Sequence, residues 1–232
     1  MTVEARSVRP VADSRRLSTV ARAVGAASLA TMALGVVGQT VFAGQVLVVG
    51  EWAQSAANVV ADPGAMRWAT LVYLAEMIAQ VAMIALWGRL VFAASPSWAA
   101  AGVGLGLTGA AIKAGGNANL VEALAVADGA AGDLNGVAAA LAAADASSAI
   151  GVMFLGLGTA LLAVASARAR VAPVWVAAVT AVTAAGWLVY LDKPTGDSLF
   201  GIVSLGALVG AMTLAVRFLG WGVGRGQAPE DD

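Results

Sequence analysis

The chain has 232 residues, of which 60% are hydrophobic and only 12% charged, and its formal net charge is −1. A soluble domain is about half apolar and roughly a quarter charged, so this composition excludes a soluble fold and predicts an integral membrane protein. The chain contains no Cys and no His, which excludes disulfides, thiolate or imidazole metal sites and a Ser-His-Asp triad. We therefore expect no metal, no cofactor and, at this net charge, no nucleic acid as a partner.

Six apolar runs predict six transmembrane helices, because each is about as long as the roughly 20 residues that cross a bilayer. In chain order they cover about 18–43, 66–92, 98–124, 146–167, 173–191 and 198–220. The predicted fold is all-α, a single integral membrane helical bundle over 18–220. A polar tail precedes it at 1–17 and a short acidic tail follows at 221–232.

Two stretches between the apolar runs predict short amphipathic helices on the outer surface of the membrane. Residues 51–62 form the first, stopped by Pro63 and Gly64, and residues 137–144 form the second. Asp145 or Ser147 is then expected to cap the next transmembrane helix.

The basic residues predict the orientation of the bundle. Cytoplasmic loops attract Lys and Arg, and most arginines of this chain fall in alternate gaps between the apolar runs, whereas the other gaps carry mainly acids. This alternation predicts cytoplasmic N and C termini and a multi-pass location in the bacterial cytoplasmic membrane, with membrane lipids as partners at the basic surface. The arginines concerned are Arg6, Arg9, Arg15, Arg16, Arg22, Arg89, Arg168, Arg170, Arg217 and Arg225.

Four polar residues inside the predicted second and third helices are the main site candidates, because ionisable groups are costly in a membrane. Glu76 and Gln80 lie four residues apart, as do Lys113 and Asn117, so each pair shares a helical face. At 1.5 Å per residue, Glu76 and Lys113 fall about 15 Å below the outer ends of their helices. We therefore expect the four side chains to meet in the outer half of the bundle.

The cluster supports several interpretations. It forms a buried ion pair that fixes helix register, or it lines a pocket that binds or carries a small apolar or amphipathic ligand. Alternatively, the chain is an enzyme on an isoprenoid or lipid substrate with Glu76 as catalytic acid, a role that pairing with Lys113 would oppose. A further alternative is an accessory subunit of a larger membrane complex. The expected ligand-binding residues are Gln80, Lys113, Asn117, Glu122 and Gln39.

Glycines predict close contacts between helices, because small residues let helix backbones approach each other. Gly102 and Gly106 form one GxxxG pair, and Gly206 and Gly210 form another. Gly156 and Gly158 are expected to thin one side of the fourth helix. These faces predict packing within the bundle or, alternatively, a homodimer or a membrane protein partner.

Two stretches resemble a bacterial six-helix membrane family known only as domain of unknown function 4386. The first covers 53–90, a polar alanine-rich segment before an apolar helix with a basic end, and the second covers 154–175, a Gly-rich helix, a basic loop and a Pro-started helix. Members of that family carry an Arg or Glu in the third helix and a His-Asp before the fourth, where this chain has Lys113, Glu122 and an Asp145 without a His. The resemblance implies the six-helix architecture and no particular activity.

Overall fold

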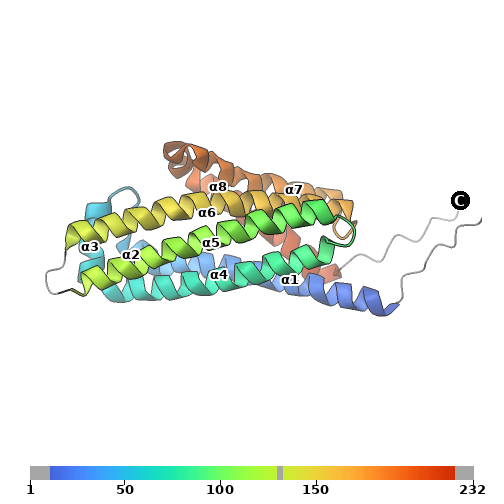
Figure 1. The fold of residues 1–232 in the computed structure, drawn as a ribbon, viewed down its shortest axis with the longest axis horizontal. Helices are drawn as coiled ribbons and strands as arrows, with labels where there is room; N and C mark the ends of the chain where they lie inside the picture. Colours follow the sequence, from blue (N-terminus) through green and yellow to red (C-terminus); the bar gives the residue numbers. More distant parts are fainter. Residues whose placement is uncertain (1–10, 130–132, 223–232) are drawn as a thin grey trace, which may run out of the picture.

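A computed structural model describes residues 11–129 and 133–222, and these ranges are almost entirely helical, as predicted. Six long helical segments run back and forth along one axis, and one short helix lies at one end of the bundle (Figure 1). The α-helices are α1 (Val11–Val37), α2 (Gly44–Val46), α3 (Trp52–Ala61), α4 (Pro63–Val91), α5 (Pro96–Ala127), α6 (Leu134–Arg168), α7 (Val174–Ala185) and α8 (Lys193–Trp221). A π-helical segment η1 (Gly38–Ala43) joins α1 to α2, and a 3-10 segment η2 (Gly186–Leu191) extends α7.

The long helices form a closed arrangement. Along the chain α1 packs on α4, α4 on α5, α5 on α6, α6 on α7 and α7 on α8, and α8 packs back on α1. Consecutive helices joined by short turns are normally neighbours, and here the ring closes as well. The side-by-side placement of α4, α5 and α6 is visible in Figure 1.

Five helical segments are long and apolar enough to cross a membrane, which supports a multi-pass membrane protein. They are Arg15–Val46, Pro63–Phe92, Leu134–Arg168, Val174–Leu191 and Lys193–Trp221. The remaining long helix, α5, has 32 residues. Its many glycines, together with Lys113, Asn117 and Glu122, make it less apolar than the others.

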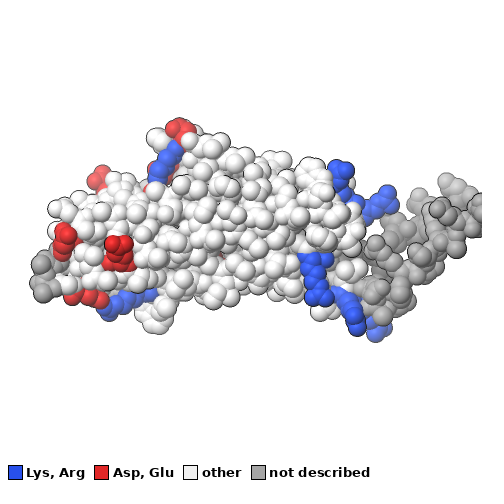
Figure 2. Space-filling view, in the orientation of Figure 1, with Lys and Arg blue, Asp and Glu red and all other residues white. Residues whose placement is uncertain are grey.

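Charged side chains gather at the two ends of the bundle and leave the surface between them uncharged in the face that Figure 2 shows. Lys and Arg lie mainly at the end where α1 begins, which we call the basic end. Asp and Glu, with some Lys and Arg, lie at the opposite end, which we call the acidic end. Among the described residues, three ion pairs lie at the acidic end: Arg67 pairs with Asp128, and Lys193 pairs with both Asp145 and Asp197.

Several predicted boundaries are wrong. The separate surface helix at 137–144 does not exist, because α6 runs unbroken through it to Arg168. Neither Asp145 nor Ser147 caps a helix: the side chain of Asp133 caps α6 by accepting a hydrogen bond from the Asn135 N–H. The alanine-rich stretch that follows favours an uninterrupted helix.

Prolines account for two further differences in the boundaries. Pro63 does not merely end the preceding helix but lies in the first turn of α4, whose first N–H groups donate to the Asp62 carboxylate. Pro194 likewise lies in the first turn of α8, which begins at Lys193 rather than near 198. Proline suits a first turn because its missing N–H would have no partner there.

Two hydrophobic cores divide the bundle along its axis. The first lies toward the basic end and contains the fully buried Trp87, Phe218, Leu162 and Leu214. The second lies toward the acidic end and is built from α2, α3, the start of α4, the end of α5 and the start of α6. Its buried members include Val59, Met66, Leu120, Val137 and Leu141.

A seam of small residues holds α5 against α6. Gly102, Gly109 and Gly116 recur every seven residues on α5, and they face Gly158, Gly151 and Ala144, spaced by seven in the opposite direction. A Cβ atom added at Gly109 would lie 2.6 Å from the Gly151 oxygen, and one added at Gly158 would lie 2.7 Å from the Gly102 oxygen. Any larger side chain would therefore push the two helices apart.

The other predicted glycine contacts also lie within the chain. A Cβ atom at Gly210 would collide with Thr183 of α7, so the GxxxG pair of α8 faces α7. The expectation that Gly156 and Gly158 thin one side of their helix is wrong, because Gly156 faces Ala184 and Trp187 whereas Gly158 faces α5. Residues two apart on a helix point in nearly opposite directions.

Candidate functional site

The structure brings Glu76 of α4 and Lys113 of α5 together in an ion pair. The Lys113 Nζ donates to Glu76 Oε1 over 2.7 Å, and the side chains are only 16% and 8% exposed, respectively. Both residues lie near the midpoints of their helices, about 20 Å from the helix ends at the acidic end of the bundle. They are farther from these ends than the sequence predicted, because α4 and α5 extend further toward the acidic end than expected.

The first helical segment closes one side of the pair. A Cβ atom at Gly35 would lie 3.6 Å from the Glu76 carboxylate carbon, an ordinary contact distance, so α1 passes directly beside the charge. One turn further on, Gly38 lies against the Tyr73 ring, where a Cβ atom would lie 2.8 Å from Tyr73 Cε1. Any side chain at Gly38 would therefore force α1 or the Tyr73 ring to shift.

A tyrosine that the sequence reasoning missed links the site to Gln39. The Tyr73 hydroxyl donates to Gln39 Oε1 over 2.7 Å. Gln39 lies in the π-helical segment η1, and its carbonyl accepts from the Gly44 N–H five residues on. Single π turns inside α-helices are frequent at functional sites. Tyr73 lies three residues before Glu76, and this spacing on a helix is the signal that would have found it.

Gln80 and Asn117 flank the ion pair, one helical turn to either side of it. Asn117 is buried, and so is the Gln80 Oε1 atom. Neither Gln80 Oε1, Asn117 Nδ2 nor the second Glu76 oxygen, Oε2, has a hydrogen-bond partner among the described residues. Buried polar atoms are normally paired, and each one left unpaired costs about 1–3 kcal/mol. The site thus holds hydrogen-bonding capacity that the described protein atoms do not use.

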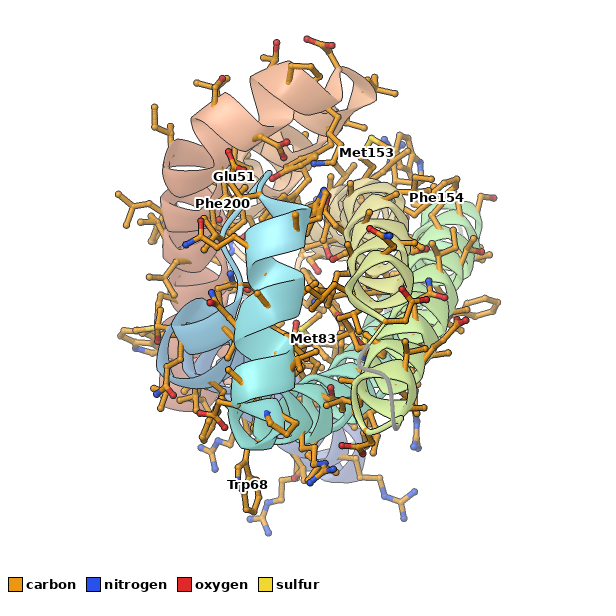
Figure 3. All side chains as sticks on the ribbon, turned by 90° about the vertical axis from the view of Figure 1, so that its left-hand side faces the viewer. Glu51, Trp68, Met83, Met153, Phe154 and Phe200 are labelled. Atoms are coloured by element: carbon orange, nitrogen blue, oxygen red, sulfur yellow. The ribbon has the colours of Figure 1, made fainter. Side chains whose placement is uncertain are left out.

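Glu122, the remaining predicted ligand residue, is not part of this cluster. It is exposed on α5, nine residues beyond Lys113 and therefore on the opposite side of the helix. At the acidic end, Trp68 of α4 also points away from the bundle, whereas Met83 lies in its interior (Figure 3). The polar cluster is therefore a local feature between α1, α4 and α5.

Two shallow hollows on the surface lie away from the ion pair. One, of about 320 Å³, is lined by Ala178, Val179, Val182 and Thr183 of α7. The other, of about 250 Å³, is lined by Ser97, Trp98, Ala101 and Leu161 of α5 and α6. Over the ranges 11–129 and 133–222, no group of three or more Asp or Glu residues is arranged to hold a metal ion.

Comparison with known proteins gives one match. The family described as Domain of unknown function (DUF4386) matches residues 23–222, a range that includes every helix from α3 to α8 and most of α1. No curated protein and no solved structure matches the chain. Because the match covers most of its length, the chain belongs to the DUF4386 family.

Proposed function

We propose that the protein is a six-span protein of the bacterial cytoplasmic membrane, with both termini in the cytoplasm, and that it binds a small amphipathic molecule at the Glu76–Lys113 cluster. The sixth span is α5. It is packed between α4 and α6, and two polar residues near its midpoint, Lys113 and Asn117, face the interior of the bundle rather than lipid. A polar helix crosses a bilayer when its polar groups face other helices.

The distribution of arginines supports the orientation. Arg89 and Arg168 lie in the last turns of α4 and α6. The first half of α1, which begins at the same end of the bundle (Figure 1), carries Arg15, Arg16 and Arg22. Lys and Arg are retained on the cytoplasmic side of membranes. The basic end is therefore assigned to the cytoplasm and the acidic end to the outside.

The lengths of α5 and α6 support an outer cap above the site. With 32 and 35 residues, these helices are about 48 and 52 Å long, whereas the hydrocarbon core is about 30 Å thick. Measured from the basic end, the part of each helix nearest the acidic end therefore extends beyond the hydrocarbon core. There they pack with α3 in the second hydrophobic core, so the site lies beneath a proteinaceous cap.

The unpaired polar atoms carry the binding proposal. A pair that served only to fix helix register would be most stable with every buried polar atom satisfied. Here Glu76 Oε2, Gln80 Oε1 and Asn117 Nδ2 have no hydrogen-bond partner within residues 11–129 and 133–222, although they lie next to a fixed charge pair. A hydroxyl, amide or amine on an otherwise apolar molecule would satisfy them, which makes an amphipathic ligand the best fit.

The ion pair favours binding over acid catalysis. The Lys113 ammonium group already occupies Glu76 Oε1 at 2.7 Å, whereas a general acid needs a carboxyl group that is free to reach its substrate. The enzyme and accessory-subunit alternatives therefore have less support than a binding or carrier role.

Native mass spectrometry of the protein from mild detergent, followed by extraction of bound molecules, tests the proposal. We expect a stoichiometric apolar or amphipathic molecule in the wild type, and its loss in the Glu76→Gln, Lys113→Met double variant, which keeps the cluster neutral and foldable. Glu122→Gln, an exposed change on the same helix, should retain the molecule. An empty wild type, or equal retention by the double variant, would reject the proposal.

A further inference from the structure

A second site lies at the basic end, on the outward surface of the α5–α6 pair. It is the hollow of about 250 Å³ formed by Ser97, Trp98 and Ala101 on α5 and Leu161 on α6. Ala101 and Trp98 are exposed. Because Ala101 contributes only a methyl group, the neighbouring Trp98 and Leu161 side chains leave a groove over it. Apart from the Ser97 hydroxyl, the side chains that line the groove are apolar or aromatic.

A basic side chain lies beside this groove. The Arg168 guanidinium lies over the Trp98 ring, with its carbon 5.5 Å from the ring centroid. In the ranges that the structure describes, no carboxylate lies within 4 Å of Arg168. A guanidinium held against an aromatic face keeps N–H donors available at its edges. Trp98 thus holds Arg168 beside the groove without using its capacity to bind an anion.

We propose that this groove binds an anionic phospholipid of the inner leaflet, with an acyl chain over Ala101 and the phosphate at Arg168. Charge complementarity selects the ligand, since the apolar groove adjoins Arg168, which has no carboxylate partner in the part of the chain that the structure describes. Guanidinium groups form strong, often bidentate hydrogen bonds to phosphate. The depth agrees as well, because Trp rings favour the membrane interface, where lipid headgroups and chains meet. Exposed Arg170, two residues beyond Arg168, adds positive charge nearby.

The chain contains a matched control. Arg217 of α8 also lies over a tryptophan, with its carbon 5.9 Å from the Trp221 ring centroid. Its guanidinium, however, donates to the Gly222 carbonyl over 3.1 Å. Trp221 lines neither of the two hollows. Arg217 therefore reproduces the charge and the aromatic contact at a place that is not part of either hollow.

Native mass spectrometry with added dioleoyl phosphatidylglycerol or dioleoyl phosphatidylcholine tests the site. We expect the wild type to bind the anionic lipid at least about fivefold more tightly, the effect of one basic residue near an anionic lipid. Arg168→Gln should reduce phosphatidylglycerol binding to the phosphatidylcholine level, and Ala101→Leu should weaken binding of both lipids by filling the groove. Arg217→Gln should leave the preference unchanged.

Three outcomes would overturn the proposal: equal binding of the two lipids by the wild type, an equal loss in Arg217→Gln, or wild-type binding by Ala101→Leu. The first outcome would show that the site does not select lipids by charge. The second would show that any arginine at the basic end has the same effect as Arg168. The third would show that the groove does not hold the lipid. Arg168 and Ala101 are both exposed, so the variants should fold, and a wild-type thermal midpoint in the same detergent checks that they do. The Glu76–Lys113 cluster plays no part in this test.

Discussion

Substituting one partner of the Glu76–Lys113 pair should destabilise the protein, whereas substituting both partners should change its stability little. Glu76→Gln leaves the Lys113 ammonium buried without its carboxylate. The two charged atoms are 2.7 Å apart and their side chains are only 8% and 16% exposed, so water screens them little. At an effective dielectric constant of about 20, their attraction is about 6 kcal/mol before desolvation is subtracted. Removing one partner of such a pair typically costs about 3–5 kcal/mol.

The double variant Glu76→Gln, Lys113→Met removes both charges and keeps the side-chain lengths. Replacing a whole buried pair by neutral residues is often neutral, so we expect its free energy of unfolding to lie within about 1 kcal/mol of the wild type. Thermal unfolding in one mild detergent, followed by tryptophan fluorescence, measures both variants. For a chain of this size, the single variant should unfold on the order of 10 °C below the wild type.

Glu122→Gln is the control, because this exposed carboxylate lies on α5 away from the pair. It should change the free energy of unfolding by less than about 0.5 kcal/mol. A single variant as stable as the wild type, or a double variant as unstable as the single, would refute the argument that the two charges compensate each other. In combination with the ligand assay, a stable double variant that lacks the ligand separates the binding role from the structural one.

Three further substitutions test the packing. Gly109→Leu forces a side chain into the α5–α6 seam and should lower the free energy of unfolding by roughly 3 kcal/mol. Gly104→Leu, on the same helix, meets open space and should leave the thermal midpoint unchanged. Equal midpoints for the two variants would contradict the close packing of the seam. Ser166→Ala removes the acceptor of the buried Trp87 Nε1–H, 2.7 Å away, and should cost about 1–3 kcal/mol in chemical unfolding; no loss would show that the bond does not stabilise the core. Lys193→Met breaks an ion pair to α6, but this side chain is 39% exposed. The loss should therefore stay below about 1 kcal/mol and shrink as salt rises, and a larger, salt-independent loss would point to a packing role.

Hydropathy and residue spacing along the chain were sufficient to predict where the long helices lie and that Glu76 and Lys113 pair. Apolar runs of bilayer length predicted where helices lie, and the structure confirms that the described residues are almost entirely helical, with five apolar segments of sufficient length. The meeting of Glu76 and Lys113 follows from their similar distances from one turn, because consecutive antiparallel helices bring such positions together. The family resemblance is confirmed over residues 23–222.

Other features depended on contacts between distant segments. Asp145 resembles a helix cap in the sequence, yet its carboxylate pairs with Lys193 of α8 over 2.8 Å while α6 passes through it. The π turn that carries Gln39, and its contact with Tyr73 34 residues away, likewise depend on how α1 packs on α4. Periodicity within one helix holds no information about either contact.

With α5 as the proposed sixth span, its modest hydropathy has a consequence for biosynthesis. A lysine at the centre of a lone helix adds roughly 2.5–3.5 kcal/mol to the free energy of insertion through the translocon, and α5 also carries many glycines and a second ionisable residue, Glu122. The carboxylate that neutralises Lys113 arrives earlier, on α4, and α6 follows to cover the glycines. We therefore expect α5 to leave the translocon paired with α4 rather than alone, so that the order of synthesis supplies each polar helix with its partner before it meets lipid.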